Sequence, residues 1–271
     1  MEYSIAKPSL LLSKFIKHYW TIESCIPSCQ QHTQRIVPNG LVELLFYLGD
    51  KPVSCDKIKS INENTIITGH LREFYDINVT GRLSLFSVLF KPHGLSMFFD
   101  IPVNELYNQN VPLQYLFKHD TAELEMRLYE ANTFTERIKI IENYFLHLLT
   151  KNRKKYDFNR IEHSINIINR KRGVVNIDYL ASEACFSRKQ FERVFSHYVG
   201  TTPKQFLKTI RFQHSINEKS KNRTTHLTAL SYQCGYYDQS HMINDFQKLT
   251  GMTPKQYFKE GEPYSDYFQG A

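Results

Sequence analysis

The sequence predicts an α+β protein: an N-terminal β-rich barrel or sandwich with trailing helices, followed by an all-α C-terminal domain. Three observations predict this class. Runs of strand-forming residues are concentrated before residue 95, apolar residues at helical spacing dominate after it, and a segment of the C-terminal third is repeated. A chain of 271 residues is long for one domain and suits two. We place the domains at residues 1–150 and 156–260, with a tail at 261–271.

The N-terminal strands are expected where β-branched and aromatic residues cluster. Residues 10–20 form an apolar, aromatic segment, and residues 35–40 have the composition of a strand that enters a turn. Residues 41–48, 65–68 and 83–90 are also rich in strand formers. Strands that precede helices in this way favour a β-rich unit with helices added behind it.

Helical signals replace strand signals in the second part of this domain. The sequence Phe-Lys-Pro-His-Gly at residues 90–94 ends the strand pattern. Thr133 and Glu136 then fit a capping box, in which each side chain accepts from the other residue's backbone amide. The helix that follows has four apolar residues on one face, namely Ile138, Ile141, Phe145 and Leu148.

Bulk composition favours an ordinary globular protein of the cytoplasm. Hydrophobic residues make up 41% of the chain, and no stretch approaches the roughly twenty apolar residues of a membrane-spanning helix. The first residues lack the basic-then-apolar pattern of a signal peptide. The five cysteines are scattered, which argues against a disulfide framework and for a reducing compartment. We therefore expect a cytoplasmic protein with no membrane partner.

The charge is divided unevenly between the two parts of the chain. Residues 1–150 hold 14 Lys and Arg against 16 Asp and Glu, whereas residues 151–271 hold 20 against 11. A compact basic domain suits a nucleic acid, because duplex DNA carries one phosphate per roughly 1.7 Å of its axis. A basic surface without a partner is the alternative. The basic run at residues 151–155 is interpreted as a linker, with phosphate contact as its alternative.

The C-terminal third contains an internal repeat. The sequence Gly-Thr-Thr-Pro-Lys-Gln-Phe at residues 200–206 recurs as Gly-Met-Thr-Pro-Lys-Gln-Tyr at residues 251–257. Upstream the offset falls from 51 to 50 residues, which a one-residue insertion in a turn explains. The repeat predicts two copies of one structural unit.

Each copy predicts a helix, a tight turn and a second helix. Ser187 and Asp238 are expected to cap the second helices, because their side-chain oxygens can accept from unpaired backbone amides. Gly200 and Gly251 end these helices where a left-handed residue is needed. Apolar residues at three- and four-residue spacing define the inward faces: Phe191, Val194, Phe195 and Tyr198 in the first copy, and Met242, Phe246 and Leu249 in the second.

The outward faces of these second helices carry side chains that can bond base edges. A helix-turn-helix places its second helix in the major groove, where Arg and Lys suit guanine and Asn and Gln suit adenine. The candidates for DNA contact are Arg188, Lys189, Glu192, Arg193, Gln239, Ser240, His241 and Asn244. The first face is basic and the second neutral, so we expect the first to contribute more affinity. A solvated helix face, or a duplicated unit without a nucleic-acid role, is the alternative.

These motifs support a family resemblance. They are Leu180-Ala181, Phe195, Gly200, Thr202-Pro203, Arg211, Gly235-Tyr236-Tyr237-Asp238, Phe246, Gly251 and Thr253-Pro254. The region from about Phe158 to Phe258 resembles the DNA-binding domain of the AraC/XylS family of bacterial transcription regulators. The resemblance implies seven helices: two helix-turn-helix units joined by a long helix, with one helix before them and one after. It also implies recognition helices in successive major grooves about 34 Å apart, promoter DNA as the partner, and RNA polymerase as a second partner of an activator.

The chain departs from the family pattern at a few positions. Cys185 stands where the family favours Gly in the first turn, and Ser215 stands where Ala is common. Glu218 and Lys219 replace the usual apolar pair at the end of the connecting helix. Glu192, in a base-facing position, can accept from cytosine N4 or repel phosphate, and both interpretations stay open.

The N-terminal half resembles the small β-barrel domain that precedes this DNA-binding domain in some AraC-type regulators. The residues that carry this resemblance are Trp20, Val37-Pro38-Asn39-Gly40, Glu43-Leu44, Gly69 and the segment 90–94. It implies a domain that senses an effector or forms a homodimer. Glu43, an acidic residue in an apolar strand, and Arg35 are the candidates for binding a small molecule. The alternatives are that Glu43 faces solvent or pairs with Arg35.

Enzymatic functions are the main competitors. His70 and His93 are candidate metal ligands, but no His-x-His pair with a nearby Glu supports a metal-dependent barrel enzyme. Alkyl transfer would need an activated cysteine, and Cys25 and Cys29 form the only close pair. We therefore expect no enzyme activity, no metal site and no cofactor. A regulator controlled by a protein partner is a further alternative.

Overall fold

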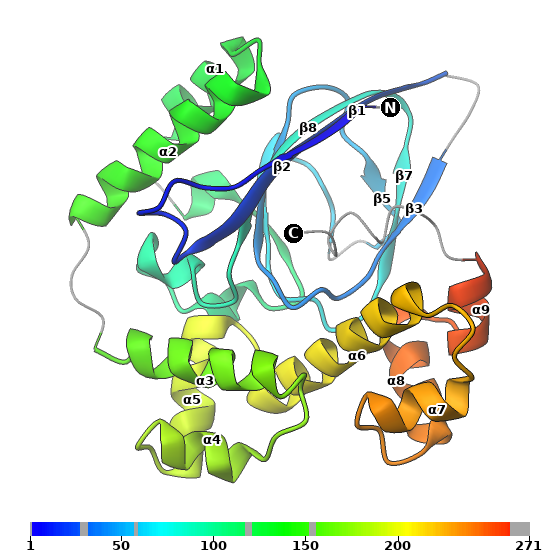
Figure 1. The fold of residues 1–271 in the computed structure, drawn as a ribbon. Coiled ribbons are helices and arrows are strands. Elements are labelled where there is room, and N and C mark those ends of the chain that lie inside the picture. Colours follow the sequence, from blue (N-terminus) through cyan, green and yellow to red (C-terminus); the bar gives the residue numbers. More distant parts are fainter. Residues whose placement is uncertain (1, 28–31, 57–58, 117–120, 152–155, 261–271) are drawn as a thin grey trace.

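The fold places its strands on one side of the molecule and helices α3 to α9 on the other (Figure 1). The computed structural model describes residues 2–27, 32–56, 59–116, 121–151 and 156–260. The linker expected at residues 152–155 and the tail at 261–271 lie outside the described residues. No helix in the described ranges is long and apolar enough to cross a membrane.

The strands form two antiparallel sheets. The larger has six strands in the order β1 (Glu2–Ala6), β2 (Ile16–Ile26), β8 (Gly81–Phe90), β4 (Glu43–Tyr47), β6 (Thr65–Thr68) and β9 (Asn110–Pro112). The smaller has three strands in the order β3 (His32–Ile36), β7 (Tyr75–Val79) and β5 (Val53–Ser54). The predicted strands at residues 65–68 and 83–90 are present, and β8 ends at Phe90 as expected.

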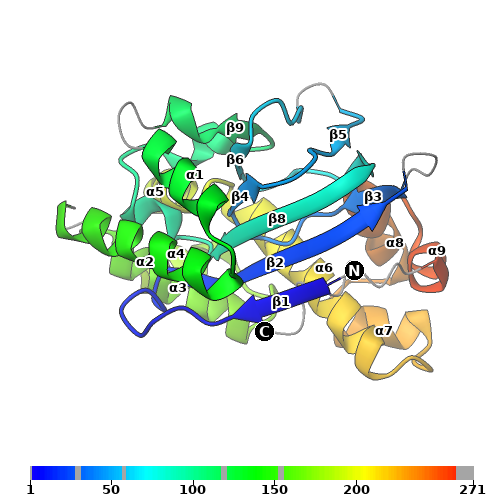
Figure 2. The same cartoon turned by 90° about the horizontal axis from the view of Figure 1, so that it is seen from above.

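Both faces of the larger sheet are covered at its centre, where four of the five residues of β4 and all four residues of β6 are buried. Helices α1 (Thr121–Glu130) and α2 (Phe134–Lys151) lie on one side of it. On that side Phe86 packs against Phe134, and Phe90 packs against Phe145, with ring centroids 6.0 and 5.5 Å apart. The other face is turned toward the smaller sheet, which Figure 2 shows from above.

The capping box of α2 is present. The backbone amide of Glu136 donates to Thr133 Oγ1 at 3.2 Å, and the amide of Thr133 donates to Glu136 Oε2 at 3.1 Å. Three short 3₁₀ helices, η1 (Leu95–Met97), η2 (Val103–Leu106) and η3 (Leu113–Tyr115), connect β8 to α1. Gly94 allows β8 to enter η1, because a Cβ there would lie 1.9 Å from the carbonyl oxygen of Phe15.

The C-terminal region contains the seven expected helices. They are α3 (Phe158–Arg170), α4 (Ile177–Glu183), α5 (Arg188–Val199), α6 (Pro203–Lys221), α7 (Leu227–Gln233), α8 (Gln239–Thr250) and α9 (Pro254–Glu260). Ser187 and Asp238 cap α5 and α8 as predicted, and accept from the backbone amides of Gln190 and His241. Gly200 and Gly251 end these helices at φ +93° and +72°.

The two parts of the chain share a continuous hydrophobic core. One cluster of buried residues runs from the larger sheet through α2 and η2 into α3, α5 and α6. Phe15 packs against Phe158 with centroids 5.7 Å apart, and the side chain of Val103 lies against Gly200. The helix-turn-helix region therefore rests on the strand-bearing region through packed side chains as well as through the chain connection.

Candidate nucleic-acid interface and effector cavity

The first helix-turn-helix unit consists of α4 and α5, which cross at small buried residues. Ala181 and Ala184 are 2% exposed, so the second helix can approach closely. Cys185 occupies the turn at φ +51°, a left-handed conformation that explains why Gly is favoured there. Arg160 of α3 stabilises this turn by donating to the carbonyl oxygens of Ala184 and Cys185 at 2.7 and 2.5 Å. Its guanidinium also stacks 3.4 Å over the Phe186 ring, a role that sequence reasoning missed.

The outward face of α5 presents two unpaired cations. Arg188, Lys189 and Arg193 are exposed, and Glu192 is half-buried. Arg188 pairs with Asp178 at 3.0 Å and with Glu192 at 3.2 Å. Lys189 and Arg193 have no ion pair with any described residue. The structure thus gives Glu192 a partner in its own helix, while base contact by these four residues stays a prediction.

The second unit consists of α7 and α8 and presents a neutral face. Ser240 and Asn244 are exposed, whereas Gln239 and His241 are half-buried. Gln239 accepts from the hydroxyl of Thr228 in α7 at 2.7 Å. The face of α8 is therefore polar and uncharged at Gln239, Ser240 and Asn244, as the sequence predicts, and its contact with bases stays a prediction.

Asp245, which sequence reasoning missed, holds α8 on α6. Its side chain is 9% exposed and lies 3.4 Å from both Lys208 Nζ and Arg211 Nη2 of α6. His241 Nε2 lies 3.8 Å from the same carboxylate. The Arg211 guanidinium also lies 4.9 Å from the centre of the Tyr236 ring. These contacts orient the second recognition helix relative to the connecting helix.

The unusual end of α6 has a local explanation. Ser215 is fully buried and donates to the carbonyl oxygen of Phe212 at 2.7 Å, so its hydroxyl is satisfied inside the helix. Lys219 donates to the carbonyl oxygens of Arg223 and Thr225 at 2.6 and 2.7 Å. The lysine therefore stabilises the loop after α6, and an apolar residue would leave these two carbonyls without that donor.

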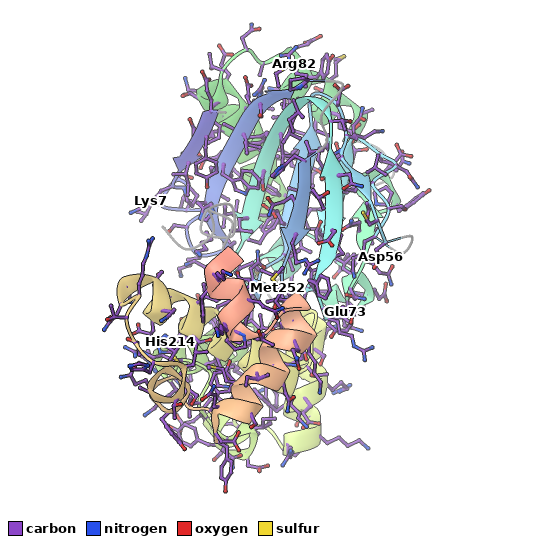
Figure 3. All side chains as sticks on the ribbon, turned by 90° about the vertical axis from the view of Figure 1, so that its right-hand side faces the viewer. Lys7, Asp56, Glu73, Arg82, His214 and Met252 are labelled. Carbon is purple, nitrogen blue, oxygen red and sulfur yellow. The ribbon has the colours of Figure 1, made fainter. Side chains whose placement is uncertain are left out.

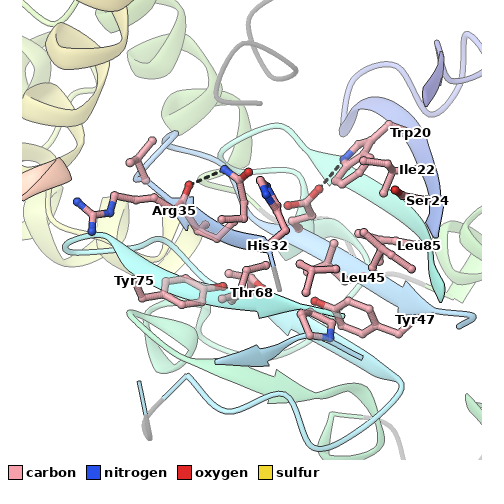
Figure 4. A pocket seen from close by; sticks show the side chains of 18 of the residues that line it. Trp20, Ile22, Ser24, His32, Arg35, Leu45, Tyr47, Thr68, Tyr75 and Leu85 are labelled. Carbon is pink, nitrogen blue, oxygen red and sulfur yellow. Dashed lines mark hydrogen bonds between the residues drawn. The ribbon is translucent and has the colours of Figure 1, made fainter. Parts of the chain in front are cut away.

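A cavity of about 460 Å³ lies between the two sheets, and Figure 4 shows labelled side chains of both sheets directed toward it. Alternate residues of each strand line it, because successive side chains point to opposite faces. The larger sheet contributes Trp20, Ile22, Glu43, Leu45, Tyr47, Thr68 and Leu85, and the smaller contributes His32, Gln34, Tyr75, Ile77 and Val79. A volume of this size accommodates a small organic molecule.

Glu43 faces this cavity and neither points to solvent nor pairs with Arg35, so both alternatives raised from the sequence are wrong. Its Oε1 accepts from Trp20 Nε1 at 2.6 Å and from Ser87 Oγ at 2.5 Å. Burial raises the pKa of the Glu43 carboxyl to about 7, although these two hydrogen bonds act in the opposite direction. Arg35 instead forms a two-point bond with Asp76, with both N–O distances 2.8 Å.

The cavity reaches helices α6 and α8 at one end. Arg35 Nη1 donates to the carbonyl oxygen of Thr250, the last residue of α8, at 2.9 Å. Gln213 of α6 also lines the cavity, and its Nε2 donates to the carbonyl oxygen of Pro38 at 2.7 Å. Figure 3 shows Met252 and Glu73 where the two regions meet. A ligand between the sheets would therefore touch residues that are bonded to both α6 and α8.

The two candidate metal ligands, His70 and His93, do not line the cavity. His70 packs edge-on against Phe206, and His93 lies with its ring centroid 4.8 Å from that of Phe158. Burial lowers the pKa of both imidazoles to about 4. In the described part of the chain, no group of three or more His, Cys, Asp or Glu is placed to hold a metal ion. Cys25 lines the cavity, and Cys29 lies outside the described residues.

Two families match separate parts of the chain. Residues 4–112 match the family described as "Domain of unknown function (DUF6597)", and residues 180–260 match the family described as "Helix-turn-helix domain". An HTH-type transcriptional regulator of Haemophilus influenzae is 30% identical over 84 residues, which are 31% of this chain and 28% of that protein. Another from Mycobacterium tuberculosis is 31% identical over 87 residues, which are 32% of this chain and 33% of that protein. The chain thus matches about a third of these relatives' length.

Two solved structures are also similar to this chain. ToxT from Vibrio cholerae is 12% identical, with 89% of this chain and 98% of that chain covered and a TM-score of 0.48. The DNA-binding domain of AdpA, solved in complex with a target DNA, is 20% identical and covers 37% of this chain and 91% of that chain, with a TM-score of 0.35. The region that matches, residues 180–260, contains α5 to α9, so the C-terminal part of the chain is a helix-turn-helix domain similar to those of bacterial transcriptional regulators.

Proposed function

We propose that this protein is a sequence-specific transcription regulator that reads two successive major grooves and responds to a small molecule in its N-terminal cavity. The observation that carries the DNA-binding part is the pair of capped recognition helices, α5 and α8, with exposed polar faces. Residues 151–271, which contain both helices, carry the entire positive excess of the chain. Function at promoter DNA would place the protein in the bacterial cytoplasm, and no enzyme activity is needed for it.

The two recognition helices have different roles in this proposal. Lys189 and Arg193 supply charge and bonds to guanine, because neither is held by an acidic neighbour. Ser240 and Asn244 of α8 read bases by neutral hydrogen bonds. Arg188 is bonded to both Asp178 and Glu192, Gln239 is bonded to Thr228, and His241 Nδ1 lies 3.5 Å from the backbone amide of Tyr237. The side chains of Arg188, Glu192, Gln239 and His241 must therefore leave these partners before they can contact DNA.

The DNA-binding part is tested by selecting bound sites from random duplex DNA and measuring affinity for the selected site by fluorescence anisotropy. We expect Arg193→Ala to weaken binding by about 5- to 150-fold, equivalent to 1–3 kcal/mol, and to relax preference at one base position. Arg82→Ala is the matched control, because Arg82 is exposed at the end of the molecule remote from the helices (Figure 3). Equal losses for both variants, or no preference over competitor DNA, would refute the proposal.

The effector part rests on the contacts between the cavity and the helices. Arg35 of β3 is bonded to the end of α8, and Gln213 of α6 is bonded to Pro38, two residues after the end of the same strand. We expect Gln213→Ala to change the affinity for the selected DNA although Gln213 lies on the cavity side of α6. If Gln213→Ala binds the selected DNA with the affinity of the unmodified chain, both with and without a molecule bound in the cavity, then the cavity does not control DNA binding.

Two further partners complete the proposal. An activator of this type contacts RNA polymerase, and a homodimer would place two such domains on neighbouring sites. Transcription from the selected site with purified RNA polymerase tests the first, and sedimentation of the full chain tests the second. A protein partner in place of the small molecule is the second candidate for control, and the accessible cavity argues against it.

A further inference from the structure

We infer that the cavity between the two sheets binds an organic cation, a small amine or ammonium compound whose charged nitrogen lies against Glu43 and whose apolar body lies among the surrounding rings. This inference rests on the proposed control by a small molecule, and it names the class of that molecule. It follows from the charge, the hydrogen bonds and the shape of the cavity.

The carboxyl of Glu43 has one occupied oxygen and one free oxygen. Trp20 and Ser87 both donate to Oε1, and no described residue donates to Oε2. Two donors on one oxygen fix the orientation of the carboxyl group. The free oxygen is therefore held in place as an acceptor on the wall of the cavity.

Glu43 also has no counter-ion among the residues that the structure describes. The one Arg or Lys that lines the cavity is Arg35, and Asp76 neutralises its guanidinium through two hydrogen bonds. A buried carboxylate is stable only when it is paired or protonated. The raised pKa of Glu43, caused by burial, reflects this missing partner. A ligand with a positive charge would supply it.

The remaining walls suit an apolar body next to a cation. Trp20 and Tyr47 line the same cavity, and aromatic faces attract cations through their quadrupoles, whereas the Tyr75 ring already has Lys59 Nζ 5.1 Å from its centre. Leu45, Leu85 and other aliphatic residues complete the lining. An anionic ligand would lie beside an unpaired carboxylate, and Arg35, the one Arg or Lys in the lining, is occupied by Asp76.

The chain contains a reporter for this site. Trp20 is its only tryptophan, and its indole nitrogen bonds the carboxyl oxygen that would hold the cation. The experiment titrates the full chain with 2-phenylethylamine, 2-phenylethanol and 3-phenylpropionate, which share a phenyl ring and differ in charge. Fluorescence of Trp20 and calorimetry are recorded for each. We expect the amine to bind at least tenfold more tightly than the alcohol, and the propionate not to bind.

Variants then assign the preference to Glu43. Glu43→Gln removes the charge and keeps an acceptor for Trp20 and Ser87, so we expect it to bind the amine and the alcohol equally. Glu63→Gln is the matched control, because Glu63 is exposed and the charge change is the same. Ile77→Phe, which reduces the cavity, should weaken the amine and the alcohol alike. The comparison of the three compounds in the unmodified chain does not depend on the folding of any variant.

The outcomes separate this inference from the proposed function. The inference that the cavity binds an organic cation is wrong if the amine and the alcohol bind equally, if the propionate binds more tightly than the amine, or if none of the three binds. A Glu43→Gln variant that keeps the preference for the amine also overturns it. Sequence-selective DNA binding is measured separately, so its absence would refute the regulator and leave the cation site standing.

Discussion

Replacing Asp245 with asparagine is a direct test of how the second recognition helix is held. Asp245 of α8 is 9% exposed at its side chain, and Lys208 and Arg211 of α6 are 19% and 18% exposed. Asparagine keeps the shape and removes the charge. Two mostly buried cations would then face a neutral amide across the contact between α6 and α8.

The magnitude follows from the burial of these groups. Removing one partner of a fully buried ion pair costs about 3–5 kcal/mol, because the remaining charge is left without compensation. Here the cations are about one-fifth exposed and lie 3.4 Å from the carboxylate, so water and relaxation recover part of that cost. We expect Asp245→Asn to lower the free energy of unfolding by about 2 kcal/mol, which is close to a 30-fold change in the folding equilibrium.

The assay is urea unfolding of the full chain followed by circular dichroism at the helix band. Glu218→Gln is the control, because Glu218 pairs at 3.1 Å with Lys221, whose side chain is 62% exposed. Exposed pairs contribute about 0–1 kcal/mol, so this variant should stay near the unmodified chain. A loss below about 0.5 kcal/mol for Asp245→Asn, or equal losses for the two variants, would refute the reasoning.

Three further predictions concern the fold. Gly94→Ala should lower the free energy of unfolding by at least about 2 kcal/mol, measured by thermal unfolding, because its Cβ would overlap the carbonyl oxygen of Phe15 at 1.9 Å. Ser187→Ala should cost about 1 kcal/mol in the same assay, because α5 loses its N-terminal cap, whereas Ser187→Asn should cost little. Burial lowers the pKa of His70 from 6.5 to about 4. Between pH 6.5 and pH 4 the His70 imidazole therefore binds a proton in the unfolded chain but stays neutral in the native protein. Stability should therefore fall as the pH falls from 6.5 toward 4, by about 1.6 kcal/mol between pH 6.5 and 5 from this residue. His70→Gln should reduce that slope, whereas His147→Gln at an exposed site should leave it unchanged.

Local signals explain why the C-terminal domain could be predicted closely. Helix caps such as Ser187 and Asp238 act within three residues, and the αL conformations of Gly200 and Gly251 are local properties of the backbone. The inward residues of α5 and α8 recur with the helical period, so burial could be inferred without knowing the partner helix.

The partners of the charged residues could not be predicted in the same way. The sequence identified Glu43 as an unusual acid in an apolar strand, but Trp20 and Ser87 are brought to it only by the register of β2, β4 and β8. The pairing of β3 with β7 brings Arg35 into contact with Asp76, which lies 41 residues later in the chain. The sequence did not indicate that Asp245 is buried against α6, because an acidic residue on a recognition helix ordinarily faces solvent.

The sequence by itself determined the two helix-turn-helix units, their caps, and the division of charge between the halves of the chain, because each of these depends on neighbouring residues or on composition. Only the tertiary structure decided that two sheets enclose a cavity, that Glu43 faces it without a counter-ion, and that Arg35 and Gln213 connect its walls to α8 and α6. These features depend on strand order and on contacts across more than a hundred residues, such as Arg35 with Thr250 and Gln213 with Pro38. Such contacts form when buried surfaces meet, and no short-range pattern in the chain specifies them.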